Sequence, residues 1–330
     1  MTLLTKGLAW AALAGTVMYG SVATAASVRL RWVAQAQFAG VYVAKAKGFY
    51  KEAGLDMTIN PGGPNIGVEP LVASGADTFG IAGAIDSMLY AREKNLPLVC
   101  IGMSQQASAY AFVAHSGSGI DAVKDFKGKT VAAWFTGSQY TLYTVLAHEG
   151  LKPGDMKVVA QPFSMQPFID RQYDVATVTL YNELNTLREQ GVTGLKVFKA
   201  DDFGVATQMD AIVTSEKVIR EKPGEVQGFL DATLKGWKYA FEHKAEAVDI
   251  VMAAGSGLDR KHQELMLDAI ENLMLAHSGK TRGLGYVDMG VVKSVADQLL
   301  AYKALKAPVD LKPAFDASFW DKVPDANKKL

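Results

Sequence analysis

The stretch that decides the fold reads Phe38-Ala-Gly-Val-Tyr-Val-Ala-Lys-Ala-Lys-Gly-Phe-Tyr-Lys-Glu-Ala-Gly-Leu-Asp-Met-Thr-Ile-Asn-Pro-Gly-Gly-Pro64. Apolar side chains recur at helical spacing from Phe38 to Ala53, and Gly54 is typical of a helix C-terminus. Leu55–Ile59 then alternates apolar and polar residues, which predicts a strand. A helix followed at once by a strand indicates an α/β protein.

The same alternation continues on both sides of this stretch. Before it, Val28–Val33 predicts a strand, and after it the pattern predicts a helix over 67–74 and a strand over 77–82. A helix over 85–94 and a strand over 98–103 follow. Repeated strand–helix–strand units of this kind predict a mostly parallel sheet covered by helices.

A second α/β series follows the first, and the remainder of the chain is predicted to be helical. The predicted strands of the second series are 111–114, 129–134, 157–160, 175–180 and 195–199, and its main helix, over 139–149, has Ser138 as N-cap. Ser116-Gly-Ser-Gly119 is the expected crossing between lobes, and the chain should return near Asp210. With 330 residues, we expect residues 26–114 plus 211–330 to form lobe 1, with the C-terminal helices on it, and residues 115–210 to form lobe 2.

The first 25 residues have the pattern of a signal peptide. Lys6 gives a basic start, an apolar run extends from Gly7 to Val22, and Ala23-Thr-Ala25 is a small-residue cleavage site. We predict cleavage after Ala25, with Ala26 as the alternative, and export to the periplasm. A transmembrane anchor is the competing interpretation, for which the run is short.

Composition excludes several function classes. Lysine plus arginine and aspartate plus glutamate each number 34, so the net charge of zero argues against nucleic-acid binding and against a polybasic membrane-surface protein. The one cysteine, Cys100, lies in an apolar segment and excludes a disulfide framework or an iron–sulfur cluster. Five scattered histidines give no metal-site spacing. We therefore expect no metal, no cofactor and no catalytic residue.

Two segments at predicted strand ends carry the strongest ligand signals, because ligands of open α/β sheets bind where strands end and helices begin. Trp134 and Phe135 precede a Thr-Gly-Ser turn that opens a helix, so a ring could stack there. In the segment Tyr181-Asn182-Glu183, a carboxylate could accept paired hydrogen bonds from an aminopyrimidine. Core packing of Trp134, helix capping by Ser138 and a first-turn role for Glu183 are the structural alternatives.

Three further loops contribute weaker candidates at helix starts and crossovers. The complete set of candidate ligand-binding residues is Gln37, Phe38, Tyr42, Gly63, Gly83, Trp134, Phe135, Gly137, Ser138, Tyr181, Asn182 and Glu183.

The Phe38–Asp56 stretch resembles the opening of ABC-transporter solute-binding proteins. Pro61-Gly-Gly-Pro64, Leu71-Val-Ala-Ser-Gly-Ala-Asp-Thr-Phe-Gly80 and Asp125-Phe-Lys-Gly-Lys-Thr-Val131 continue the resemblance in order. The branch includes binding proteins for thiamine-pyrimidine precursors, sulfonates, nitrate and taurine. The resemblance implies a two-lobe, type II-like periplasmic-binding-protein fold, a ligand clamped between the lobes, and an inner-membrane permease with its ATPase as partners. We expect a monomer.

The resemblance also bears on the ligand. Trp134 and Phe135 favour a flat heteroaromatic vitamin precursor over a bare anion, and by resemblance Tyr181 would stack on an aminopyrimidine while Glu183 hydrogen-bonds it. Riboflavin or a small anion (sulfonate, nitrate, taurine) is the alternative ligand. Pyrimidine synthases of the same fold carry a cysteine-rich iron-binding run where this chain has Val175–Leu180, which argues against an enzyme. A sensor-type binding protein would share all these features.

Overall fold

The computed structural model describes residues 23–203 and 207–330. The predicted signal peptide therefore lies almost wholly outside the described residues. Thr24 and Ala25, which the predicted cleavage would remove, form the exposed start of strand β1, opposite Leu55 and Asp56 of β2.

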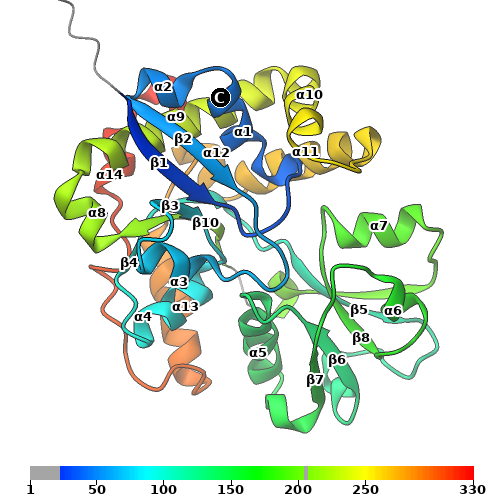
Figure 1. The fold of residues 1–330 in the computed structure, drawn as a ribbon. Coiled ribbons are helices and arrows are strands. Elements are labelled where there is room, and N and C mark those ends of the chain that lie inside the picture. The colour runs from blue at the N-terminus through cyan, green and yellow to red at the C-terminus, as the bar shows by residue number, and fades with distance from the viewer. Residues whose placement is uncertain (1–22, 204–206) are drawn as a thin grey trace, which may run out of the picture.

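Two five-stranded sheets organise the molecule, and each forms the centre of one lobe (Figure 1). Lobe 1 has the strand order β2-β1-β3-β10-β4, with β1 (Thr24–Arg29), β2 (Leu55–Asn60), β3 (Phe79–Ile81), β4 (Leu98–Gln105) and β10 (Met209–Ser215). Lobe 2 has the order β7-β6-β8-β5-β9, with β5 (Tyr110–His115), β6 (Thr130–Ala133), β7 (Lys157–Ala160), β8 (Val175–Thr179) and β9 (Leu195–Lys199).

The helices cover both sheets. Those between the strands are η1 (Ala36–Phe38), α1 (Ala39–Ala46), α2 (Phe49–Glu52), α3 (Val68–Ala73), α4 (Ile85–Glu93), η2 (Val123–Phe126), α5 (Ser138–His148), η3 (Pro153–Asp155), α6 (Gln166–Ile169), α7 (Glu183–Glu189) and η4 (Ala200–Phe203). After β10 come α8 (Glu216–Glu221), α9 (Pro223–Glu242), α10 (Lys244–Ala254), α11 (Arg260–Met274), α12 (Ser278–Arg282), α13 (Met289–Ala301), α14 (Ser318–Lys322) and α15 (Asp325–Lys328).

The α/β class is as the sequence predicts, but the sheets are mixed rather than mostly parallel. Strand β1 pairs in parallel with β2 and β3, and β6 with β7 and β8. Strands β10 and β5 are antiparallel to their neighbours. Both follow a crossing between the lobes, so they enter their sheets from the opposite direction to the strands built by helical crossovers.

The expected boundary at residue 114 is wrong for one strand. Strand β5 belongs to lobe 2, where Ala111 and Val113 pack in the same apolar cluster as Phe168. The chain therefore crosses between Gln105 and Tyr110, and the Ser116–Gly119 segment is a turn within lobe 2. The return crossing ends at Met209, where β10 begins.

Two local predictions near the N-terminus also change. The helix expected over Phe38–Ala53 is divided into α1 and α2, because Gly48 takes a left-handed φ of 79° that ends the first helix. The strand expected over Val28–Val33 instead ends at Arg29. The chain then leaves the sheet and carries Arg31 and Trp32 toward lobe 2.

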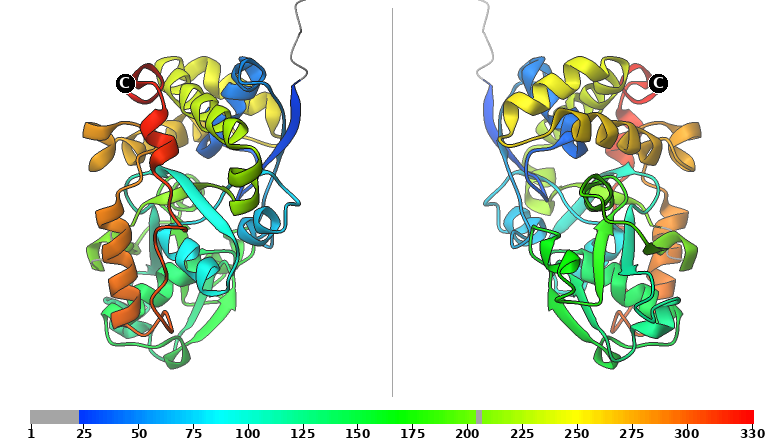
Figure 2. Two further views of the ribbon diagram at one scale, coloured as in Figure 1. Left: turned by 90° about the vertical axis from the view of Figure 1, so that its left-hand side faces the viewer. Right: turned by 90° about the vertical axis from the view of Figure 1, so that its right-hand side faces the viewer.

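The C-terminal helices pack on lobe 1. Helix α9 lies against α1 so closely that a Cβ on Gly236 would come within 2.1 Å of the Gly40 carbonyl oxygen, which accounts for glycine at this crossing. Figure 2 shows α10 and α11 (yellow) at the same end of the molecule as β1 (blue). Within residues 23–203 and 207–330, no helix combines the length and apolar character that crossing a membrane requires.

Candidate ligand-binding site

A pocket lies where the two lobes meet, and we call it the inner pocket. Lobe 1 contributes Arg31, Trp32, Gln35 and Gln37. Lobe 2 contributes Tyr110, Trp134, Thr136, Ser138, Thr179, Tyr181, Asn182 and Glu183. Its free volume is about 20 Å³, enough for one or two water molecules. A ring-sized ligand therefore needs the lobes to separate and close again around it.

Aromatic rings from both lobes form one wall of the inner pocket. The Trp32 and Trp134 ring centroids are 5.3 Å apart at an interplanar angle of 66°, and Phe163 stacks on Trp32 at 5.6 Å and 13°. Trp134 donates its Nε1–H to the carbonyl of Pro162 at 3.4 Å. The buried Nε1–H of Trp32 has no hydrogen-bond partner among the described residues. A donor buried in this way is costly unless a ligand supplies an acceptor.

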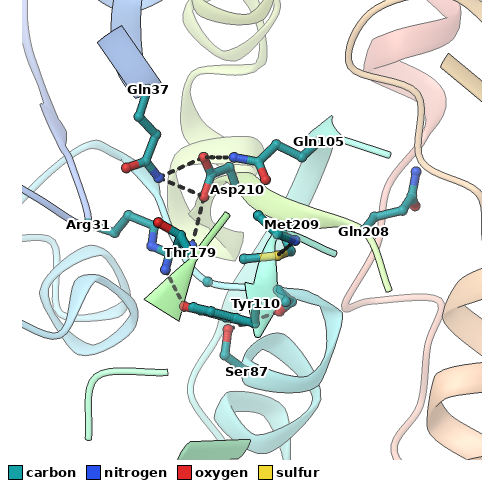
Figure 3. A network of polar contacts seen from close by, with 12 residues as sticks. Arg31, Gln37, Ser87, Gln105, Tyr110, Thr179, Gln208, Met209 and Asp210 are labelled. Atoms are coloured by element: carbon teal, nitrogen blue, oxygen red, sulfur yellow. Dashed lines mark hydrogen bonds and ion pairs between the residues drawn. The ribbon is translucent and has the colours of Figure 1, made fainter. Parts of the chain in front are cut away.

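A charged network lies at the lobe 1 side of the pocket (Figure 3). Arg31 Nη1 donates to Asp210 Oδ1 at 2.8 Å, and Arg31 Nη2 donates to the Tyr110 hydroxyl of lobe 2. Gln37 and Gln105 donate to Asp210 Oδ2 at 2.9 and 2.7 Å. Asp210 is therefore held by three side chains, and Arg31 already has two partners.

Burial and pairing act in opposite directions on these groups. Burial by itself lowers the pKa of Arg31, but Tyr110 and Asp210 raise it by more. The pKa therefore lies above its ordinary value, and the guanidinium stays charged. Burial raises the pKa of Asp210, and Arg31 and Gln37 partly offset that rise. Asp210 also has a positive φ of 55°, which is uncommon for a residue other than glycine. Such a conformation persists only where its surroundings fix it.

Hydrogen bonds from the end of β8 and from the residue before α7 hold the carboxylate of Glu183. Glu183 Oε2 accepts from the Thr179 N–H at 2.9 Å and the Thr179 hydroxyl at 2.7 Å, and Oε1 accepts from Asn182 Nδ2 at 2.6 Å. Oε2 thus already accepts two hydrogen bonds, whereas Oε1 keeps a second lone pair for a ligand donor. Tyr181 beside it is buried, and burial raises its pKa well above the usual value, so the phenol stays neutral.

The turn between β6 and α5 satisfies its own polar groups. Gln139 Oε1 accepts from the Gly137 N–H at 2.8 Å, and Ser138 Oγ accepts from the Trp134 N–H at 3.1 Å. Ser138 is the first residue of α5 and not its N-cap, because the chain bends at Gly137. The Gln139 and Tyr140 N–H groups donate to the Trp134 and Gly137 carbonyls, so this helix start offers few free donors to an incoming anion.

The lobes touch again on both sides of the inner pocket. In α11, His262 Nε2 lies 2.9 Å from Asn182 Oδ1 and Nδ1 lies 2.9 Å from Glu189 Oε2, both on lobe 2. Between α4 and α5, Thr141 donates to Asp86 Oδ2 at 2.9 Å. Burial raises the pKa of Asp86 to about 6, against hydrogen bonds that lower it. These contacts hold the lobes in a closed arrangement.

Two larger pockets share walls with the inner one. The His262 pocket, with a free volume of about 380 Å³, shares Gln35, Asn182 and Glu183 with it and adds Phe163 and His262. The Phe135 pocket, of about 390 Å³, shares Thr136. Phe135 and Gly137 line this second pocket.

The structure brings half of the sequence-predicted residues together in the inner pocket. They are Gln37, Trp134, Ser138, Tyr181, Asn182 and Glu183.

Four candidates line none of these three pockets. Phe38 and Tyr42 are buried in the lobe 1 core, because η1 and α1 turn these side chains away from the cleft. Gly83 packs on α4, where a Cβ would meet Ser87 Oγ at 2.3 Å. Gly63 has open space around it, and its neighbour Gly62 is the residue that passes close to the backbone, at Leu30.

Sequence reasoning did not select several pocket residues. Arg31 and Trp32 were assigned to the interior of a strand, although their place near its carboxyl end was a usable signal. Gln35 and Thr136 lie beside selected residues (Gln37 and Phe135) but carry no distinguishing feature of their own. Nothing local marks Asp210 or His262, whose partners are distant in the sequence. Among the described residues, no cluster of three or more histidine, cysteine, aspartate or glutamate side chains has an arrangement that could hold a metal ion.

Known proteins share sequence with most of this chain. The riboflavin-binding protein RibY of Chloroflexus aurantiacus is 28% identical, covering 89% of this chain and 85% of its own. The formylaminopyrimidine-binding protein of Halalkalibacterium halodurans is 25% identical, covering 88% and 89%. A 4-amino-5-hydroxymethyl-2-methylpyrimidine phosphate synthase of Candida albicans is 25% identical, covering 66% and 68%.

The fold has solved counterparts. The periplasmic aliphatic sulphonate binding protein SsuA of Escherichia coli superposes with a TM-score of 0.64 at 16% identity, covering 88% of this chain and 91% of that one. This likeness confirms the expected two-lobe fold. The model of the NMT1/THI5-like family matches residues 35–247, more than half of the sequence, and the chain therefore belongs to the NMT1/THI5-like family.

Proposed function

We propose that this protein is the periplasmic substrate-binding component of an ABC importer and that its ligand is a heteroaromatic vitamin precursor of the thiamine-type aminopyrimidine class. The ligand enters the cleft between the lobes, is enclosed by hinge closure, and is delivered to an inner-membrane permease with its ATPase. The predicted signal peptide and the binding-protein relatives support this role.

The unpartnered indole N–H of Trp32 is the observation that carries the proposal. Trp32 lines the inner pocket together with other aromatic rings and with Glu183, and its indole nitrogen is buried. A flat ring that carries both an acceptor and an amine satisfies the indole donor and the carboxylate acceptor together. Stacking on an aromatic wall adds roughly 0.5–1.5 kcal/mol beyond burial of area.

The charges of the inner pocket favour such a ligand over a small anion. Arg31 is the cationic side chain of its lining, and it is paired with Asp210 and Tyr110. Glu183 adds a negative charge. A sulfonate or nitrate would meet a carboxylate and a guanidinium that is already paired, so binding would cost desolvation without a free counter-charge.

Riboflavin is the second candidate. Its larger ring system would extend beyond the inner pocket, and the adjoining His262 pocket offers about 380 Å³ for it. The match to the riboflavin-binding protein RibY covers 89% of this chain.

Synthesis of the pyrimidine is the competing function from another class. The match to the Candida albicans synthase covers 66% of this chain, whereas the matches to the formylaminopyrimidine-binding and riboflavin-binding proteins cover 88% and 89%. The one cysteine, Cys100, is buried in β4, and burial raises its pKa to about 12, which makes it a poor nucleophile.

The test is a titration of the purified mature protein. Formylaminopyrimidine, hydroxymethylpyrimidine, thiamine, riboflavin and an alkanesulfonate are added separately while calorimetry and tryptophan fluorescence are recorded. We expect micromolar or tighter binding of a heteroaromatic compound, weakened by Trp134→Ala and by Glu183→Gln. Glu264→Gln, on an exposed side chain of α11, is the matched control. Binding of the sulfonate alone would overturn the proposal.

A further inference from the structure

The His262 pocket has a charge pattern that bears on the chemical class of the ligand. Among its lining residues are three carboxylates, Glu183, Glu189 and Asp259, and no lysine or arginine. His262 is its one basic side chain, and its Nδ1 lies 2.9 Å from Glu189 Oε2. The pocket is therefore negative even when His262 carries a proton.

The other walls of this pocket suit a chain of hydroxyl groups. Phe163 covers one side with an exposed ring, and Gln190 presents its amide. Asn182 is already bonded to Glu183 and His262, but its amide nitrogen keeps a second N–H. A hydroxyl can donate to a carboxylate and accept from an amide at the same time. A phosphate oxygen can only accept when ionised, and near neutral pH the group carries −1.5 to −2 charges.

The ring and its substituent would occupy adjoining spaces. The inner pocket shares three lining residues with the His262 pocket and one with the Phe135 pocket. In the Phe135 pocket, the amine of Lys94 lies 3.3 Å from the Tyr140 hydroxyl, and the buried Glu69 lies in the same lining. A substituent leaving the ring therefore has its widest connection toward His262.

Resting on the proposed function, we infer that the site takes a heteroaromatic ligand whose substituent is a neutral, hydroxylated chain in the His262 pocket, and that it rejects the phosphorylated form of the same ligand. The three carboxylates repel a phosphate, whereas hydroxyl groups find partners on both sides. Like charges brought together across a binding interface discriminate strongly against the wrong partner. The importer would then collect the dephosphorylated precursor.

The experiment compares matched pairs. Riboflavin is measured against riboflavin 5′-phosphate, and 4-amino-5-hydroxymethyl-2-methylpyrimidine against its phosphate ester, at pH 7.5 by calorimetry. We expect the phosphorylated member of the bound pair to bind at least about tenfold more weakly. The ratio of the two affinities should become smaller as the salt concentration is raised, because the carboxylates of Glu189 and Asp259 are solvent-exposed and salt screens their charges.

A charge reversal gives the second arm. Glu189→Lys should narrow the ratio several-fold, while Asp297→Lys, the same charge change at an exposed position of α13 outside the three pockets, should leave it unchanged. Equal affinity for both members of a pair would overturn the inference and leave the proposed function standing. Failure of all four compounds to bind would overturn the inference, and failure of formylaminopyrimidine and thiamine as well would overturn the proposed function with it.

Discussion

Trp32 of lobe 1 and Trp134 of lobe 2 meet edge to face across the cleft, with ring centroids 5.3 Å apart. One indole N–H is bonded to the Pro162 carbonyl, and the other, on Trp32, is unpartnered among the described residues. The two rings therefore share one wall but have different tasks. The Trp134 N–H is bonded within lobe 2, whereas that of Trp32 is the donor that the proposed ligand would satisfy.

Replacement of Trp32 by phenylalanine removes this donor and keeps an aromatic ring. We expect ligand affinity to fall about tenfold, since an acceptor left unpaired in a buried site costs roughly 1–3 kcal/mol. Trp320→Phe is the matched control, because Trp320 donates to the Leu284 carbonyl at 2.7 Å, outside the three pockets. Calorimetry gives the affinities. Equal losses in both variants would show that the effect is not specific to the cleft.

The buried pair of Arg31 and Asp210 provides a stability prediction. In Asp210→Asn, the asparagine has the same size and tolerates the positive φ, but Arg31 loses its counter-charge. The free energy of unfolding should therefore fall by roughly 3–5 kcal/mol. Adding Arg31→Met should recover part of that loss, because no buried charge is then left alone. Urea denaturation of the two single variants and the double variant measures the coupling, and strictly additive losses would contradict it.

Asp86 makes stability depend on pH with an uncommon sign. Its pKa rises from 3.8 to about 6 in the folded protein, so the folded state holds this proton more tightly than the unfolded state. The stability contributed by this group is therefore greatest below pH 4, falls as the pH rises toward 6, and is flat above. The loss is roughly 3 kcal/mol.

Asp86→Asn should remove this dependence. An asparagine can accept from the Ser87 N–H and donate to the Thr141 hydroxyl, so both contacts are kept. We expect the variant to be more stable than the parent at pH 7 and the difference to vanish toward pH 4. Denaturation curves at several pH values test it, with Asp297→Asn on the surface as control. Parallel stability profiles for parent and variant would contradict the assigned pKa.

The His262 bridge should control how long the ligand stays bound. His262→Ala removes the contacts to Asn182 and Glu189, so the closed arrangement opens more readily. We expect the dissociation rate to rise about tenfold with little change in the association rate. Stopped-flow tryptophan fluorescence separates the two rates. His243→Ala, whose ring contacts Tyr239 within lobe 1, is the control, and an equal effect there would contradict the prediction.

The order and type of most elements could be predicted because they depend on local patterns. The alternation at Leu55–Ile59 and the glycine stop at Gly54 act over a few residues, and β2 begins at Leu55 as expected. Predictions failed where distant partners decide the outcome. Strand β5 joins lobe 2 because β8 and β9 pair with it, and Arg29 ends β1 although the alternation continues beyond it.

Some residues of the candidate site could likewise be predicted from local patterns, and others could not. Strand ends and helix starts marked Trp134 and Glu183 without any structure, because ligands of open sheets bind there. Phe38 and Tyr42 have equally suitable side chains, yet the direction of η1 and α1 places both in the core. Side-chain direction is set by how a helix packs and not by which residues it contains.

The sequence by itself determined an α/β chain with one buried cysteine, balanced charge and two aromatic-rich strand ends. Only the tertiary structure decided that Trp32 would face Trp134, that Asp210 would hold Arg31, and that His262 would bridge the lobes. The physical reason is distance along the chain. Periodicity and capping are properties of neighbouring residues, whereas a cleft is formed by residues that become neighbours only when two lobes close.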